Sequence, residues 1–193
     1  MNDVNRCPWP SDDPLMIAYH DQDWGTPVHD DRKHFEYLLL DCFQAGLSWK
    51  TVLYKRENFR KAFDDFDYHK VARYGQKKFE QLLLDPEIIR NKAKISATIN
   101  NAACLIKIQD EFGSFDQYIW QFTGGKTKHN AWIRLSKLPA STKESDAMSK
   151  DLIKHGFKFA GTTICNAYMQ AAGMVNDHLK GCFRYNELLK RQI

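Results

Sequence analysis

The sequence predicts an all-α fold, and three observations lead to this prediction. Apolar residues recur every three or four positions through most of the chain, which is the spacing of a helix with one buried face. Persuasive strands are absent, because the one alternating segment, residues 157–163, has no nearby segment to pair with. The chain has 193 residues, 43% of them hydrophobic, which is enough for one core and too little for two full domains. We therefore expect loop-connected helices in a single domain, residues 1–193.

The first half of the chain predicts four helices. A helix at about 32–44 follows from apolar residues at helical spacing behind an acidic pair. Ser48 is placed to cap a second helix, whose apolar positions continue to Phe63. Asp67 can cap a short third helix. Residues 77–84 form a fourth, which ends at the following Asp-Pro pair because proline excludes the residue before it from the helical region.

The second half predicts four more helices. The longest covers about 91–110, where aliphatic residues line one face. A shorter helix stops at the double glycine 124–125. Ser141 and Glu144 have the spacing of a capping box, which opens the next helix. A last helix is expected at about 163–174.

Composition excludes several classes of protein. Aromatic residues make up 13% and charged residues 27%, which is typical of a globular chain and argues against disorder, collagen and coiled coils. No stretch approaches the roughly 20 apolar residues of a membrane span. Residues 1–31 carry seven acidic groups and one basic group, the reverse of the basic start of a signal peptide. We expect a cytoplasmic protein with no membrane contact.

Charge and cysteine content point to a partner and a chemistry. Residues 32–193 carry 27 basic and 17 acidic groups, a net charge of +10 that suggests a polyanion such as nucleic acid, although a basic chain is also common for solubility alone. The irregular, basic segment 123–140 is either a surface loop or a contact loop. The five cysteines form no close, even framework, so free or metal-bound thiols are expected rather than disulfides.

One cysteine and one histidine lie near each end of the chain. Cys7 and His20 near the N-terminus, with His178 and Cys182 near the C-terminus, could together supply four zinc ligands. The spacing from His178 to Cys182 is one helical turn, which suits chelation. Surface histidines and buried thiols would give the same pattern. If the four residues bind one metal ion, it joins the two ends of the chain.

Aromatic residues concentrate in the first fifty positions. Trp9, Tyr19, Trp24 and Trp49 can all pack in a core, and we interpret Trp24 in this way. The alternative for the others is stacking, because enzymes that act on a nucleobase flip it from the duplex and hold it between aromatic faces. Asp41 is a candidate partner for such a base, since it lies in an apolar helix where an unpaired carboxylate is costly. A surface Asp in the last helical turn is the simpler interpretation.

The turn between the helices at 77–84 and 91–110 is followed by basic residues. Backbone N–H groups at a helix start, with Arg90, Lys92 and Lys94 nearby, form a phosphate site that ignores base sequence. An ordinary connection between helices with solvated lysines would look the same.

Several motifs occur together and in order. They are YHDQDWG at 19–25, QAGLSW at 44–49, EIIRNKAKI at 87–95 and GFKFAGTTICNAYMQAAGMVNDH at 156–178. Together they resemble the 3-methyladenine DNA glycosylase I family over almost the whole chain, and this combination is far more specific than any single motif. The resemblance implies a helix-hairpin-helix glycosylase-like fold with a zinc site that joins the N- and C-terminal segments.

The resemblance also assigns site residues. It implies structural zinc bound by Cys7, His20, His178 and Cys182, which pins segments 1–30 and 175–193, and a helix-hairpin-helix at about 77–110. The implied base pocket and catalytic residues are Trp9, Met16, Tyr19, Trp49 and Asp41. The implied DNA-binding residues are Gly46, Leu47, Arg90, Asn91, Lys92 and Lys94, with Leu47 able to wedge into the base stack.

Three positions depart from the family pattern. Asp41 stands where the family usually has glutamate, so the carboxylate is set back by about 1.5 Å, a shift that can cost a site about a hundredfold in rate. Met16 replaces an aromatic residue, and its thioether can still contact a ring. Pro86 and Glu87 stand in the hairpin where glycine is common, which adds a negative charge beside the expected phosphate.

The function implied is a monofunctional DNA N-glycosylase of base excision repair. It flips 3-methyladenine out of damaged double-stranded DNA and excises it, leaving free 3-methyladenine and an abasic site. We expect a monomer and no nucleotide cofactor. The alternative is a zinc-stabilised DNA- or lesion-binding homologue with altered or lost base specificity, because Asp41 replaces the family glutamate.

Overall fold

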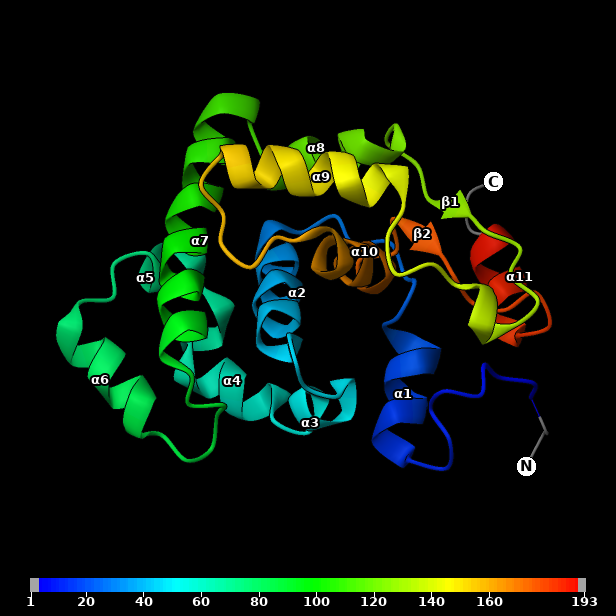
Figure 1. Ribbon diagram of the computed structural model, residues 1–193, viewed down its shortest axis with the longest axis horizontal. Coiled ribbons are helices and arrows are strands. Elements are labelled where there is room, and N and C mark those ends of the chain that lie inside the picture. Colours follow the sequence, from blue (N-terminus) through cyan, green and yellow to red (C-terminus); the bar gives the residue numbers. More distant parts are fainter. Residues whose placement is uncertain (1–3, 191–193) are drawn as a thin grey trace.

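Helices surround a central one, α2, in the computed structural model, which describes residues 4–190. The α-helices in chain order are α1 (Pro14–Gln22), α2 (Asp31–Gln44), α3 (Trp49–Leu53), α4 (Arg56–Ala62), α5 (Tyr68–Val71), α6 (Gln76–Leu84), α7 (Lys92–Phe112), α8 (Phe115–Trp120), α9 (Lys143–Lys154), α10 (Thr162–Ala171) and α11 (Phe183–Lys190). Short 3₁₀ turns lie at Asp64–Phe66, Gln121–Thr123 and Leu135–Lys137. The predicted all-α class is confirmed (Figure 1).

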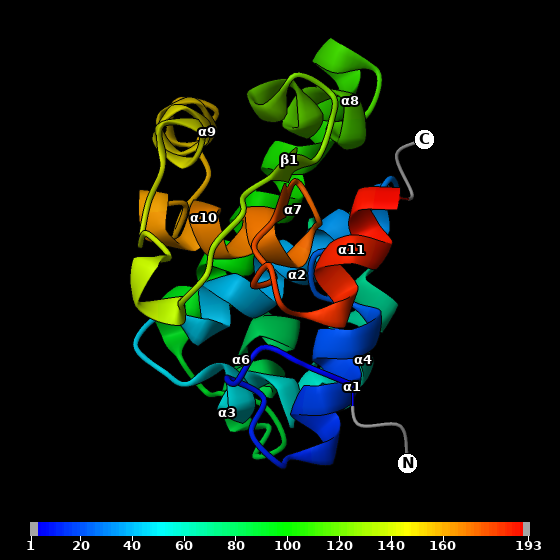
Figure 2. The same ribbon diagram turned by 90° about the vertical axis from the view of Figure 1, so that its right-hand side faces the viewer.

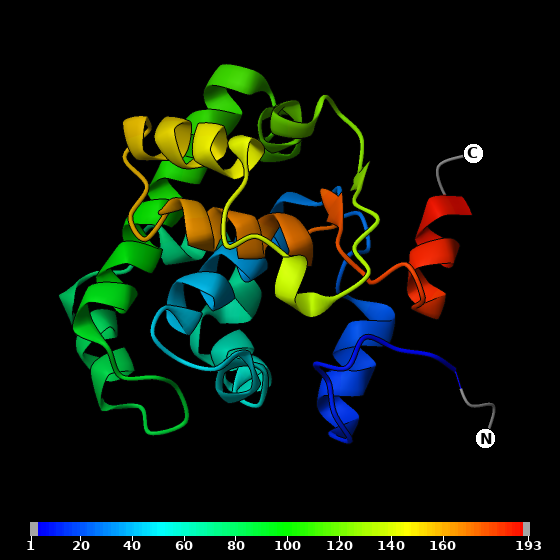
Figure 3. The same ribbon diagram turned by 45° about the vertical axis from the view of Figure 1, so that its right-hand side comes forward.

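The core forms where α2 meets its neighbours. Helix α2 contacts α3, α7, α8 and α10, while α9 packs across α10 (Figures 1 and 3). Phe35 and Phe43 of α2 are buried, as are Ile95 of α7 and Tyr168 of α10. Burying large side chains such as these contributes about 1.5–3 kcal/mol each. The last turn of α2 is therefore held rigidly, and this turn carries Asp41.

The two ends of the described chain lie at the same end of the molecule. Helices α1 and α11 both lie at that end, with α11 above α1 in these views, away from α5 and α6 (Figures 1 and 2). Sequence periodicity predicted neither helix. Helix α1 is capped by Asp13, whose side chain accepts hydrogen bonds from the N–H groups of Leu15 and Met16. The predicted terminal segments 1–30 and 175–193 include residues 1–3 and 191–193, which lie outside the described residues.

A short parallel strand pair corrects the expectation that strands are absent. In the described part of the chain, β1 (Lys128–His129) pairs with β2 (Val175–Asn176), and residues 157–163 form no strand. Two residues are too few to give a sequence pattern. The pair fixes one end of the basic segment 123–140 beside the C-terminal segment.

Two helix predictions are wrong in detail. The second predicted helix is broken into α3 and α4 at residues 54–55, although Ser48 caps α3 by accepting from Thr51 N–H at 3.2 Å. The capping box of α9 uses Thr142 and Ser145 rather than Ser141 and Glu144. The N–H of Ser145 donates to the hydroxyl of Thr142 at 3.1 Å, and the N–H of Thr142 donates to the hydroxyl of Ser145 at 2.8 Å. The remaining predicted helices are confirmed to within a few residues at each end.

Helices α6 and α7 form a helical hairpin around residues 85–91. Asn91 caps α7, and its side-chain oxygen accepts from the N–H of Lys94 at 3.1 Å. Lys55 of the loop before α4 donates to the carbonyl of Glu87 at 2.8 Å, so the hairpin is anchored to the body. Across residues 4–190, no helix combines the length and apolar character needed to cross a bilayer.

Candidate functional site

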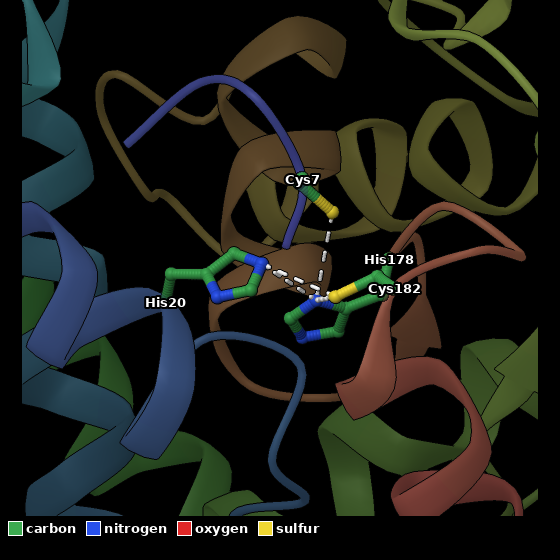
Figure 4. A group of neighbouring side chains, drawn as sticks. All are labelled: Cys7, His20, His178 and Cys182. Atoms are coloured by element: carbon green, nitrogen blue, oxygen red, sulfur yellow. Dashed lines mark hydrogen bonds between the residues drawn. The ribbon is translucent and has the colours of Figure 1, made fainter. Parts of the chain in front are cut away.

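The two cysteines and two histidines predicted from the chain ends do come together (Figure 4). Cys7 lies in the N-terminal segment and His20 on α1, while His178 and Cys182 lie between β2 and α11. All four are buried, and one ligand atom from each falls within 4.8 Å of the other three. His178 Nδ1 lies 3.2 Å from His20 Nε2, 3.6 Å from Cys182 Sγ and 3.8 Å from Cys7 Sγ. Cys182 Sγ lies 3.5 Å from His20 Nε2.

Neighbouring groups decide which ring nitrogen faces the cluster. His20 Nδ1–H donates to Asp21 at 2.7 Å, and His178 Nε2–H donates to the carbonyl of Trp24 at 2.9 Å. The inward nitrogens, His20 Nε2 and His178 Nδ1, are then free of protons and available as ligands. Gly25 lies against this site with a φ of +77°, and a Cβ there would stand 3.1 Å from the ring of His178. Glycine is required by both the backbone conformation and the close approach.

The cluster has the composition of a metal site. Hydrogen bonding from Cys7 lowers the pKa of Cys182, and the same bond raises the pKa of Cys7, so the protein alone favours one thiolate of the two. A cation between them would favour both thiolates. Two sulfur and two nitrogen ligands that converge in a buried site would complete the coordination of a tetrahedral metal ion and leave no coordination position for a substrate. This arrangement suits a structural metal ion.

An aromatic cavity of about 230 Å³ lies beside the metal cluster. The residues that line it come from the N-terminal segment, α1 and the segment after it, α2, α3, α10 and the segment after β1. They are Trp9, Tyr19, Trp24, Asp41, Gln44, Trp49, Leu138, Ala167 and Gln170. The rings of Tyr19 and Trp49 lie 4.9 Å apart, and those of Trp9 and Trp24 lie 5.2 Å apart. Such a cavity fits a flat, aromatic ligand.

Asp41 supplies an unpaired carboxylate to this cavity. Its side chain is 4% exposed, and Oδ2 has no hydrogen-bond partner within residues 4–190. Burial raises its pKa well above the ordinary value of an aspartate. The indole N–H groups of Trp9 and Trp49 are also buried without a partner among the described residues. Buried polar groups are nearly always satisfied in native proteins, so one acceptor and two donors left open beside one cavity indicate a polar ligand.

A second hollow continues from the first toward the surface. It measures about 210 Å³, shares Asp41, Gln44 and Ala167 with the aromatic cavity, and includes Gly46 and Leu47. Gly46 has a φ of +77°, and Leu47 is 43% exposed. An apolar side chain is thus presented to solvent next to the mouth of the cavity.

Comparison with known proteins identifies the architecture. The family model described as methyladenine glycosylase matches residues 9–185, a span that contains all the cavity residues. This chain belongs to the methyladenine glycosylase family. The predicted family and its fold, with the cluster that joins the two ends, are confirmed.

Close relatives support the assignment to the methyladenine glycosylases. The chain is 48% identical to DNA-3-methyladenine glycosylase 1 of Escherichia coli, covering 94% of this chain and 97% of that one. It is 41% identical to DNA-3-methyladenine glycosylase of Haemophilus influenzae, covering 93% and 97%. A crystal structure of a 3-methyladenine DNA glycosylase I superposes with a TM-score of 0.90 at 49% identity, covering 93% of this chain and 98% of that one. A variant glycosylase solved in complex with 3-methyladenine also gives 0.90, at 34% identity and coverage of 93% and 97%.

The structure brings most of the predicted pocket residues of this methyladenine glycosylase together. Trp9, Tyr19, Trp49 and Asp41 all line the aromatic cavity. Met16 does not belong to the lining found among the described residues, and it is buried in the same apolar cluster as Tyr19. Trp24, interpreted from sequence as a core residue, packs beside the metal cluster and also lines the cavity.

The expected phosphate contact of Lys94 is wrong. Lys94 is 5% exposed, and its ammonium donates to the carbonyls of Phe43 and Ala45 at 2.8 and 2.5 Å. It lies one turn inside α7, where helical geometry points it at the C-terminal end of α2 rather than at solvent. Burial lowers its pKa. Lys94 fixes the residues just before Gly46.

The other hairpin residues stay available at the surface. Arg90, Asn91 and Lys92 are exposed at the start of α7. The side chain of Asn91 is used as the helix cap, whereas Arg90 and Lys92 are exposed and form no ion pair within the described chain.

Sequence reasoning missed four residues of the methyladenine glycosylase cavity, namely Gln44, Leu138, Ala167 and Gln170. Gln44 follows Asp41 by three positions, which places both on one face of α2, and this spacing was a usable signal. Gln170 lies inside a quoted motif but carries no charge to draw attention. Leu138 reaches the cavity only through the path of the long loop after β1, which no local pattern encodes.

Proposed function

We propose that this methyladenine glycosylase excises 3-methyladenine from damaged double-stranded DNA and leaves an abasic site. The chain is a monofunctional DNA N-glycosylase, as its relatives of 41–48% identity are named 3-methyladenine glycosylases. The observation that carries the proposal is the unpaired, buried carboxylate of Asp41 in an aromatic cavity. We propose residues 1–193 as a single domain that acts as a monomer.

The cavity suits a cationic base better than a neutral one. Adenine methylated at N3 carries a positive charge while it is attached to the sugar. The faces of Trp9, Tyr19 and Trp49 favour a cationic ring over a neutral one. The carboxylate of Asp41 can accept a hydrogen bond from the edge of that ring. Burial raises the pKa of Asp41, and the positive charge of a bound base would counteract this effect and favour the ionised carboxylate.

The bond to be broken is already weak, so the residues act chiefly by binding and orienting the base. When the bond between the sugar C1′ and N9 breaks, its electron pair neutralises the base, which leaves as uncharged 3-methyladenine. Water adds its oxygen to C1′ and releases one proton to solvent. Burial keeps the pKa of the Tyr19 hydroxyl well above its ordinary value, so Tyr19 stays a neutral hydrogen-bond donor in the pocket.

Two surface features support binding to a duplex. We propose that Leu47 enters the base stack at the position that the flipped base leaves, with Gly46 supplying the turn that presents it. Arg90, Asn91 and Lys92 at the start of α7 are proposed to bind phosphate, through two exposed cations and the backbone of a helix N-terminus. Neither feature reads base sequence.

We propose zinc as the metal of the Cys7, His20, His178 and Cys182 cluster. Zinc bonds of about 2.05 Å to nitrogen and about 2.3 Å to sulfur, in a tetrahedron, require separations of about 3.3 Å between nitrogens and about 3.6 Å between nitrogen and sulfur. The corresponding distances are 3.2 Å for the nitrogens and 3.5, 3.6 and 3.8 Å for the mixed pairs. A bound zinc ion would cross-link the chain ends and take no part in the reaction.

A release assay tests the proposed function. Duplex DNA methylated with a radiolabelled alkylating agent is incubated with the protein, and the released bases are separated by chromatography. We expect free 3-methyladenine, one abasic site for each base released, and strands that stay intact until treated with alkali. Binding to the duplex with no release of base would instead identify a lesion-binding protein.

A further inference from the structure

Asp177 is a buried carboxylate that serves neither the metal cluster nor the core. It is 3% exposed and follows β2, next to the metal ligand His178 in the sequence. Three side-chain donors surround it. Asn130 and Trp132 donate to Oδ1 at 2.8 and 2.7 Å, and Gln170 donates to Oδ2 at 2.7 Å.

The bond from Gln170 fixes the orientation of an amide that lines the base cavity. A carboxylate only accepts hydrogen bonds, so the NH₂ group of Gln170 must face Asp177. Its carbonyl oxygen, Oε1, has no hydrogen-bond partner among the described residues, and Gln170 lines the cavity, so Oε1 is the polar atom of this side chain left for a ligand. If the amide of Gln170 were turned over, its hydrogen bond to Asp177 would be lost and its carbonyl oxygen would face the Asp177 carboxylate, which repels it.

The geometry points to Gln170 as a further base-recognising residue, locked by Asp177 as an acceptor that selects alkylated adenine over alkylated guanine. Adenine carries an amino group at C6, which donates hydrogen bonds, whereas guanine carries a carbonyl at the same place, which accepts them. A free glutamine could turn to suit either base. A locked one presents an acceptor only, so a guanine O6 would meet an unfavourable partner.

This inference rests on the proposed function and deepens it. Asp41 and Gln170 line the same cavity, one on α2 and the other on α10, so two acceptors face one bound base. Asn130 and Trp132 both donate to Oδ1 of Asp177, so the bond from Trp132 alone can still hold that oxygen. The specificity of the pocket would therefore depend on Asp177, which does not line it.

The test is Asp177→Asn. The new amide must keep its oxygen toward Asn130 and Trp132, so its NH₂ group faces Gln170 and turns that amide over. A donor then replaces the acceptor in the cavity. We expect the ratio of 3-methyladenine to 3-methylguanine released from methylated duplex DNA to fall at least about tenfold, the equivalent of one exchanged hydrogen bond.

Two further variants separate this effect from loss of structure. Gln170→Leu removes acceptor and donor together, so release of 3-methyladenine should fall with no gain for 3-methylguanine. Asn130→Ala removes one of the two bonds to Oδ1 of Asp177 and leaves those from Trp132 and Gln170, so it should lower the melting temperature and keep the wild-type ratio. A ratio that is unchanged in both Asp177→Asn and Gln170→Leu would overturn the inference, as would an equal change in Asn130→Ala. Absence of 3-methyladenine release by the wild-type protein would instead contradict the proposed function.

Discussion

Replacement of Asp41 by asparagine should make the protein more stable and less active. Asp41 is buried with one oxygen unpaired, and burial raises its pKa. The carboxylate of Asp41 therefore destabilises the folded protein without ligand and stabilises the complex with a cationic base. Asparagine has the same shape and no charge, so it removes the cost of desolvating the carboxylate while it loses the attraction to a cationic base.

The size of the effect follows from the burial. A buried, unsatisfied polar group costs about 1–3 kcal/mol, and charged groups lie at the upper end. For a chain of this length, 1 kcal/mol corresponds to about 2–4 °C in melting temperature, so Asp41→Asn should melt about 2–12 °C higher at pH 8. Because the amide no longer complements a positive ring, single-turnover release of 3-methyladenine should fall at least about tenfold.

The pH dependence has a definite sign. The folded state binds the Asp41 proton more tightly than the unfolded state does, since the folded pKa is raised. The contribution of Asp41 to wild-type stability is fully present below its pKa in the unfolded state. It is lost as the pH rises through its pKa in the folded state. The stability advantage of Asp41→Asn should therefore be small near pH 4 and should grow toward pH 8.

Thermal unfolding of both proteins between pH 4 and pH 8 measures this difference. Asp110→Asn, at an exposed carboxylate on α7, is the matched control and should show no such growth. A variant that is less stable than wild type at every pH, or whose advantage does not change with pH, would refute the reasoning. Unchanged release of 3-methyladenine would show that Asp41 does not recognise the base.

The remaining predictions concern the metal, the hairpin and the length of the recognition carboxylate. Elemental analysis should give one zinc ion per chain for the wild type and none for Cys182→Ala, which should also melt about 10 °C lower; a zinc-free, fully stable wild-type protein would contradict the metal assignment. Lys94→Met should lower the free energy of unfolding by about 2–4 kcal/mol, because two charge-assisted hydrogen bonds are lost. A denaturant titration that shows unchanged stability would contradict this role of Lys94. Lys92→Ala and Arg90→Ala should leave stability near wild type, weaken binding to all duplexes alike and reduce the dependence of log affinity on log salt by about 1 each; strong preference for particular sequences at constant salt would argue against phosphate contacts. Asp41→Glu should keep or raise release of 3-methyladenine, since open cavity lies in front of the carboxylate, and a fall of more than about tenfold would indicate overpacking in a pocket shaped for aspartate.

Sequence alone determined the features that local chemistry encodes. Helical periodicity placed α2, α6 and α7 within a few residues, because one buried face imposes a repeat along the chain. The residue types at Cys7, His20, His178 and Cys182 were sufficient to suggest a metal, and an acid in an apolar helix was sufficient to single out Asp41. These inferences need no knowledge of which segments meet.

Tertiary structure decided which side chains face the ligand and which face each other. Lys92 and Lys94 look alike in sequence, yet only Lys94 is buried, because two positions along a helix turn a side chain through about 200° and place it on the α2 carbonyls. Helices α1 and α11 and the β1–β2 pair are too short or too weakly patterned to be read locally, and their stability comes from packing at the joined chain ends. The orientation of Gln170 depends on Asp177, seven residues away, and Asp177 itself accepts hydrogen bonds from Asn130 and Trp132 of a distant loop. Such contacts are set by the path of the whole chain, so no local pattern contains them.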